Sequence, residues 1–225
     1  MKTIQAPSPN HDARDTPVDT LILHYTDMRT GADAIARLRD PVAKVSAHYV
    51  VEEDGAVFAL VPEDRRAWHA GLSHWRGHDA LNGRSIGIEV VNPGHSCGYR
   101  AFPALQMAAV CDLCLEILAR HPIPPRNVVA HSDVSPDRKR DPGELFDWRG
   151  LAANGVGLFP DVPGDGPAPA DEAVLLKTLA DIGFRPGLPA RTLIEAFQRH
   201  WRPERVDGRA DAGTLARAEA LLRLT

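Results

Sequence analysis

The chain has 225 residues, of which 44% are hydrophobic and 25% are charged. Its formal net charge is −4, so the bulk electrostatics favour neither nucleic acid nor an anionic membrane surface as a partner, and no window is apolar enough for a transmembrane span. The length predicts one main core with a small appendage.

The N-terminus and the cysteines bear on the cellular compartment. The first residues, through His11, contain no apolar stretch long enough for a signal peptide. Cys97, Cys111 and Cys114 are an odd number of cysteines, which argues against a disulfide-stapled secreted domain. We therefore expect a cytoplasmic protein, with the periplasm or cell envelope as the alternative if a leader has been removed. Cys111 and Cys114 lie in an apolar helical pattern and are interpreted as core residues.

The N-terminal half predicts alternating strands and helices. Residues 19–24 read as a buried strand, and residues 31–39 as a short helix. Residues 46–53 and 56–61 flank an Asp-Gly pair suited to a tight turn, so they predict an antiparallel hairpin.

The next part of the chain continues this alternation after an interruption. Residues 62–83 contain several Gly, Trp and His without a sustained period and predict a long irregular excursion. Residues 85–91 and 127–131 predict strands, and 103–120 a helix. The apolar face expected on that helix consists of Phe102, Leu105, Ala109, Leu113 and Ile117. Together these elements indicate an α/β fold with a mixed central sheet flanked by helices.

The C-terminal part differs in composition. Residues 161–171 are rich in Pro and Gly and predict a linker after a domain that spans 1–160. Residues 172–225 carry three short helical apolar patterns, which predict a three-helix module. Phe197 and Trp201 form an aromatic stripe in this module.

The segment from His131 to Asp141 collects imidazole, carboxylate and cationic groups in a loop bounded by Pro142 and Gly143. Such a composition is unsuited to a core and typical of a catalytic loop. Zinc hydrolases commonly use three protein ligands, two His and one carboxylate being one such set. His131 and Asp141 are two candidates, and His24, at the end of the first buried strand, is the third.

Four ordered sequence blocks resemble the zinc-dependent N-acetylmuramoyl-L-alanine amidases of type 2, in particular the AmpD/AmiD branch. The blocks are Leu23-His24-Tyr25-Thr26, Arg66 to Gly71, Ser85 to Glu89 and His131 to Gly143. The resemblance implies Zn²⁺ as the cofactor and peptidoglycan fragments (muropeptides) as the partner. Residues 196–215 also resemble, more weakly, a peptidoglycan-binding domain of type 1, which implies glycan binding as one role of the module and a purely structural role as the other.

Glu89 and Lys139 are the catalytic candidates. Strand alternation places Glu89 and Gly87 on the face opposite Ile86 and Ile88, and a carboxylate in so apolar a strand is either a general base or a buried partner of Arg84. Lys139 precedes Asp141 by two positions and could stabilise an oxyanion, although composition alone favours a solvated charge. The family resemblance favours the catalytic role for both residues.

Three further residues are candidates for substrate binding. The guanidinium of Arg138 suits a peptide carboxylate. Trp68 and His69 are expected to line the substrate groove, with a core Trp and a hydrogen-bonded structural His as the alternatives. Asp133, beside His131, could support that ligand. The remaining histidines are expected at the surface, namely His48, His74, His78, His95, His121 and His200.

The resemblance implies hydrolysis of the amide between N-acetylmuramic acid, or its 1,6-anhydro form, and L-alanine. The ligand set by itself predicts only metal-assisted amide hydrolysis. A catalytically silent peptidoglycan-recognition protein and a zinc peptidase of other specificity therefore remain as alternatives.

Overall fold

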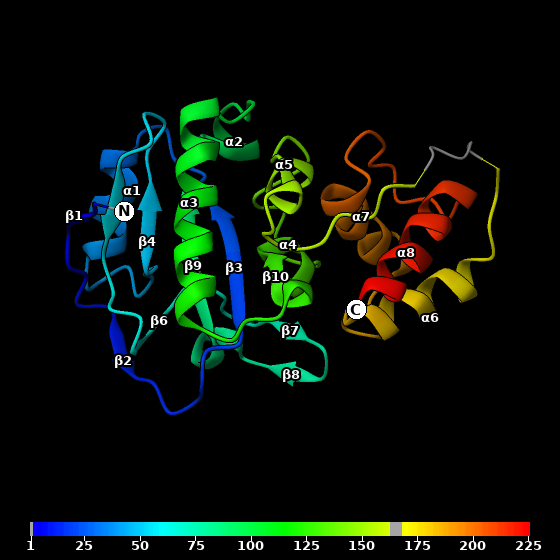
Figure 1. Cartoon of the computed structure of the whole chain (residues 1–225), viewed down its shortest axis with the longest axis horizontal. Helices are drawn as coiled ribbons and strands as arrows, with labels where there is room; N and C mark the ends of the chain where they lie inside the picture. Colours follow the sequence, from blue (N-terminus) through cyan, green and yellow to red (C-terminus); the bar gives the residue numbers. More distant parts are fainter. Residues whose placement is uncertain (1, 163–167) are drawn as a thin grey trace.

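The computed structural model describes residues 2–162 and 168–225 and confirms the predicted α/β fold. A six-stranded sheet lies at its centre, and helices cover both faces (Figure 1). Its strands, in spatial order, are β1 (Ile4–Gln5), β5 (Val57–Ala59), β4 (Tyr49–Val51), β9 (Ser85–Val90), β3 (Thr20–Tyr25) and β10 (Val128–Ala130). Strands β4 and β5 form the predicted antiparallel hairpin, whereas β4, β9, β3 and β10 pair in parallel.

Helix α3 (Ala104–Arg120) covers one face of the sheet, as Figure 1 shows. Its Val110, Leu113 and Ile117 pack with alternate residues of β3 and β9 in one core cluster. The predicted helix is confirmed, but its predicted face is wrong at Leu105, which is 71% exposed. Gln106 is buried instead, because its amide donates to the carbonyl oxygens of Val51 and Val91.

Two groups of helices cover the other face. Helix α1 (Gly31–Arg39), capped at its start by the Thr30 hydroxyl, packs Leu38 on the β4 residue Val50. Beyond the β10 edge lie α6 (Glu172–Ile182), α7 (Ala190–Trp201) and α8 (Ala212–Leu224), which we call the C-terminal module (Figure 1). Three short helices lie between these groups in the chain, namely α2 (Gly94–Cys97), α4 (His131–Val134) and α5 (Trp148–Ala153).

The predicted excursion at 62–83 is more regular than expected. It contains β6 (Arg65–Ala67), which pairs with β2 (His11–Ala13), and a small hairpin of β7 (His74–Trp75) and β8 (His78–Asp79). A 3-10 turn at Leu81–Arg84 leads into β9. These strands have two or three residues each, too short to show a hydrophobic period in the sequence.

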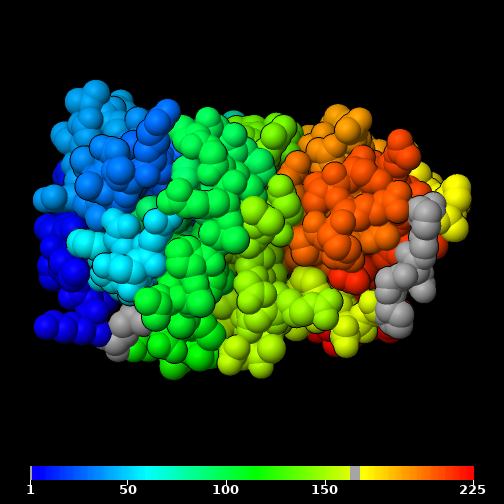
Figure 2. All heavy atoms as spheres, turned by 90° about the horizontal axis from the view of Figure 1, so that it is seen from above, coloured from blue at the N-terminus to red at the C-terminus, as the bar shows by residue number. Residues whose placement is uncertain are grey.

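The C-terminal module shares its core with the sheet. Phe197 and Trp201 are buried in a cluster that also contains Ile22 of β3 and Val129 of β10. Figure 2 shows the module, in orange, packed directly against the yellow-green part of the chain. Of the predicted linker at 161–171, residues 163–167 lie outside the described residues. No helix within the described ranges has the length and apolarity needed to cross a bilayer.

Candidate active site

The pairing of three parallel strands brings the predicted ligands together. His24 of β3 lies opposite Glu89 of β9, and Leu23 lies opposite Ala130 of β10. Because His131 follows Ala130 directly, it emerges at the same carboxyl edge of the sheet as His24. Sites in α/β sheets gather at this edge.

The loop after β10 brings Asp141 close to the two histidines. His131 is the first residue of α4, a four-residue helix that ends before Pro136. The backbone N–H of Ser132 donates to the carbonyl oxygen of Asp141 at 2.9 Å, which folds the loop back on itself. The Nδ1 atoms of His24 and His131 are 2.9 Å apart, and Asp141 Oδ2 lies 3.1 and 2.9 Å from them, respectively.

The outer nitrogens of both imidazoles have partners of their own. His24 Nε2 lies 3.0 Å from His69 Nδ1, and His131 Nε2 lies 3.3 Å from the carbonyl oxygen of Ala70. A carbonyl oxygen accepts only, so the proton of His131 is on Nε2, and the same tautomer for His24 satisfies His69. Both Nδ1 lone pairs then point toward the Asp141 carboxylate.

Three converging lone pairs are suited to holding a cation. The three side chains are buried, and the most exposed of them, Asp141, is 6% exposed. Burial, together with the neighbouring His131, lowers the pKa of His24 to about 4, so its imidazole is neutral at pH 7. Burial acts to raise the pKa of Asp141, but the adjacent His131 and His24 outweigh it and lower the value, so the carboxylate is charged. Two neutral imidazoles and one carboxylate are a donor set that fits zinc with one coordination position left open.

His69 lies behind His24 and borders the pocket. It is 8% exposed, and its Nε2 contacts the Ser85 hydroxyl at 3.2 Å, which in turn donates to the carbonyl oxygen of Leu81. Gly87 makes room for the ring, since a Cβ there would lie 2.5 Å from His69 Cγ. Its position favours the alternative of a hydrogen-bonded histidine that orients a ligand, in addition to any substrate contact.

A pocket of about 490 Å³ opens beside the three donors, and His131 and Asp141 line it. Glu89 and Lys139 line it as well. Glu89 Oε2 is buried without a hydrogen-bond partner among the described residues, and burial, reinforced by the Asp141 carboxylate, raises the pKa of Glu89 well above its usual range. Arg84 does not hold this carboxylate, because Arg84 Nε donates to Asp19 at 2.9 Å.

The predicted substrate residues also lie on this pocket. Trp68 is partly exposed there, and its backbone N–H donates to the Ser46 hydroxyl at 2.8 Å. Arg138 is exposed at the rim and donates to the carbonyl oxygen of Leu72 at 3.0 Å. Its guanidinium therefore faces the same space as Lys139.

The prediction of surface positions is wrong for two histidines. His48 is fully buried, and its Nδ1 accepts from the backbone N–H of Gly87 at 3.0 Å. His200 is 1% exposed and contacts Asp133 at 2.6 Å. The apolar residues of β4 that directly follow His48 were a signal of burial, whereas the pairing of His200 with a distant carboxylate has no signal in the local sequence.

A pocket at the carboxyl ends of parallel strands, with a group of three buried donors at its edge and a carboxyl group of raised pKa beside them, is typical of metal-dependent hydrolases. A family comparison specifies the class further. Residues 14–144 match the N-acetylmuramoyl-L-alanine amidase family, and the chain belongs to it.

Comparisons with individual proteins agree with this family assignment. The chain is 42% identical over 230 residues to the amidase AmiD of Escherichia coli, covering 91% of this chain and 82% of that protein. It is 35% identical to the 1,6-anhydro-N-acetylmuramyl-L-alanine amidase AmpD of Escherichia coli, covering 64% of this chain and 87% of AmpD.

Solved structures extend the likeness to the C-terminal module. AmiD of Escherichia coli, in complex with anhydro-N-acetylmuramic acid-L-Ala-D-γ-Glu-L-Lys, superposes with a TM-score of 0.85 at 39% identity, covering 99% of this chain and 93% of that one. AMPDH3 of Pseudomonas aeruginosa, in complex with an anhydromuramic pentapeptide, gives a TM-score of 0.83 at 33% identity, covering 92% of each chain.

Proposed function

We propose that this enzyme is a zinc amidase that hydrolyses the bond between the lactyl group of N-acetylmuramic acid, or its 1,6-anhydro form, and L-alanine of the stem peptide. The observation that carries the proposal is the convergence of His24, His131 and Asp141 beside the pocket. The anhydromuramyl peptides bound to AmiD and AMPDH3 support the substrate class.

Amide hydrolysis requires a nucleophile, stabilisation of an oxyanion and a proton for the leaving amine. When bound, zinc supplies a water of pKa near about 7 and polarises the carbonyl. Glu89 takes the proton from the attacking water and returns it to the nitrogen of the leaving L-alanine. A raised pKa makes the Glu89 carboxylate a stronger base toward the attacking water, and the proton it takes up is then available for the leaving nitrogen.

Cationic and aromatic groups complete the proposed site. Lys139 lines the same pocket as His131 and Asp141, which supports a role for its ammonium in stabilising the oxyanion. Arg138 is assigned to a carboxylate of the stem peptide, which a guanidinium binds through two parallel hydrogen bonds. Trp68 offers an aromatic surface for the sugar ring or the peptide. His69 lines the wall of the same groove.

Substitution of Glu89 separates catalysis from metal binding. Glu89→Gln keeps the shape of the side chain and removes the proton acceptor, so we expect full zinc content with at least about a hundredfold loss of turnover. Asp141→Ala should lose both zinc and turnover, because it removes a donor. Mass spectrometry of a muropeptide digest detects the free peptide. Near wild-type turnover in Glu89→Gln would contradict the assigned role.

The same digest distinguishes the alternatives. A silent recognition protein would leave muropeptides intact with zinc bound, and a peptidase of other specificity would cut within the stem peptide. Comparing anhydromuropeptides with intact sacculi also separates peptidoglycan recycling in the cytoplasm from remodelling in the envelope.

Two expectations remain predictions, namely the cytoplasmic location and glycan binding by the C-terminal module. Phe197 and Trp201 are buried, so any glycan contact must use other, exposed side chains of the module.

A further inference from the structure

One buried side chain connects the C-terminal module to the turn that begins with the candidate ligand His131. His200 lies in the last turn of α7 and is 1% exposed. Its ring stacks between Trp148, at a centroid distance of 3.8 Å, and Trp201, at 3.6 Å. The two indoles fix the plane of the imidazole, so its Nδ1 has one direction in which to donate.

The acceptor is Asp133, the residue two positions after the ligand His131. Asp133 is fully buried, and its Oδ2 lies 2.6 Å from His200 Nδ1. The same oxygen accepts the backbone N–H of Ala130 at 2.7 Å, which caps the start of α4. One carboxylate oxygen therefore joins the module to the turn that begins with His131.

This turn sets the direction of the ligand. His131 leaves the sheet at the first position of α4, so its side chain can reach the other donors only while the helical turn keeps its orientation. The turn also bonds to the second ligand segment, because the N–H of Ser132 donates to the carbonyl oxygen of Asp141. Val134 of the same turn is buried in the core of the module, in the cluster that contains Phe197.

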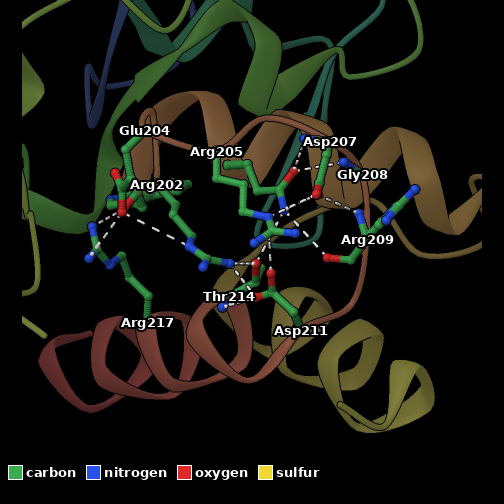
Figure 3. Close-up of polar contacts among 11 residues, drawn as sticks. Arg202, Glu204, Arg205, Asp207, Gly208, Arg209, Asp211, Thr214 and Arg217 are labelled. Carbon is green, nitrogen blue, oxygen red and sulfur yellow. Dashed lines mark hydrogen bonds and ion pairs between the residues drawn. The ribbon is translucent and has the colours of Figure 1, made fainter. Parts of the chain in front are cut away.

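A polar network holds the end of α7 in place. Arg217 of α8 donates to the carbonyl oxygen of Trp201 at 2.8 Å, directly after His200. Arg202 donates to Thr214 at 2.6 Å and pairs with Asp211, the residue that caps α8. Figure 3 shows these side chains converging between α7 and α8. The position of His200 is thus fixed by contacts between α7 and α8.

We propose that His200 is a positioning residue of the amidase: by holding Asp133, it fixes the turn that aims His131 at the metal, so the C-terminal module contributes to zinc affinity. This inference rests on the proposed metal site. Groups that bond directly to a ligand typically change metal affinity by about 10- to 100-fold when removed. His200 acts on His131 only through Asp133 and the backbone of the turn, so the lower end of that range is expected.

Two substitutions at His200 in the full chain separate the effect of the hydrogen bond from the effect of the stacking. His200→Phe keeps a ring between the indoles and removes the donor, and it should raise the zinc dissociation constant about tenfold. His200→Asn loses the ring but keeps an N–H near the place of Nδ1, and it should stay within about threefold of wild type. Zinc itself is the probe, measured by competition with a chromophoric chelator on protein whose fold is verified by circular dichroism.

A matched control tests for general destabilisation. Leu175→Ala opens the core of the module in α6 but leaves the hydrogen bond between His200 and Asp133 intact, and it should lower the melting temperature without changing zinc affinity. Equal losses of zinc affinity in Leu175→Ala and His200→Phe would overturn the inference, as would wild-type affinity in His200→Phe or a loss in His200→Asn as large as that in His200→Phe. Failure of the wild-type chain to bind zinc would instead overturn the proposed metal site.

A double-mutant cycle gives an independent test. Asp133→Ala removes the acceptor, and addition of His200→Phe should then cause little further loss of zinc affinity, because the two side chains act through one contact. Additive losses would show that His200 acts by another route and would contradict the proposal.

Discussion

The hydrogen bond between His24 and His69 predicts a measurable share of metal affinity. His69→Phe keeps a ring of similar size beside Gly87 but removes the acceptor that orients His24 Nε2 at 3.0 Å. Loss of such a partner should weaken zinc binding about 10- to 100-fold, or roughly 1.4–2.8 kcal/mol. His69→Asn places an amide oxygen near the position of Nδ1 and should recover part of the loss. Competition with a chromophoric chelator measures the zinc affinity of both variants.

A second substitution perturbs the same ring without changing it. In Gly87→Ala the new Cβ would lie 2.5 Å from His69 Cγ, so the imidazole must shift. Gly83→Ala is the matched control, since its Cβ would have no neighbour nearer than 3.6 Å. The reasoning predicts weaker zinc binding for Gly87→Ala and unchanged binding for Gly83→Ala. Zinc binding as tight as wild type in both His69→Phe and Gly87→Ala would refute the contribution of the His24–His69 hydrogen bond to zinc affinity.

Three further predictions concern stability and reactivity. Burial acts to raise the pKa of Glu63, but hydrogen bonds, chiefly from Arg120, outweigh it and lower the pKa to about 2. The stabilisation is therefore full above pH 4.5 and lost as the pH falls toward 2, so Glu63→Gln should cost on the order of 2 kcal/mol in urea unfolding at pH 7 and little at pH 2. Phe197→Ala should lower the free energy of unfolding by about 3–5 kcal/mol, measured by the same unfolding curves. Cys97 is exposed, whereas Cys114 is buried with a raised pKa, so peptide mapping after brief treatment with a thiol reagent should find Cys97 modified and Cys114 intact.

The strands and the convergence of the three candidate ligands were predictable from local sequence because each signal is short in range. The apolar run before His24 and the short strand before His131 place both residues at strand ends, and parallel pairing then brings the ends together. Alternation in β9 likewise placed Glu89 opposite the core face.

Other features depend on contacts that local pattern does not contain. Gln106 takes a buried position on α3 because two carbonyl oxygens of the sheet need a donor there, while the more apolar Leu105 faces solvent. His200 is buried because Asp133, 67 residues earlier in the chain, lies against α7. Such pairings follow from tertiary packing and have no hydrophobic period that reveals them.

Zinc stoichiometry measured together with muropeptide cleavage tests the central claim most directly. The wild-type chain should bind one zinc ion through His24, His131 and Asp141 and should release the stem peptide from an anhydromuropeptide. Alanine at any of the three positions should reduce zinc content and cleavage together, and added zinc should restore activity to chelator-treated wild type. Full zinc content in all three variants, or unchanged cleavage after complete removal of metal, would contradict the account.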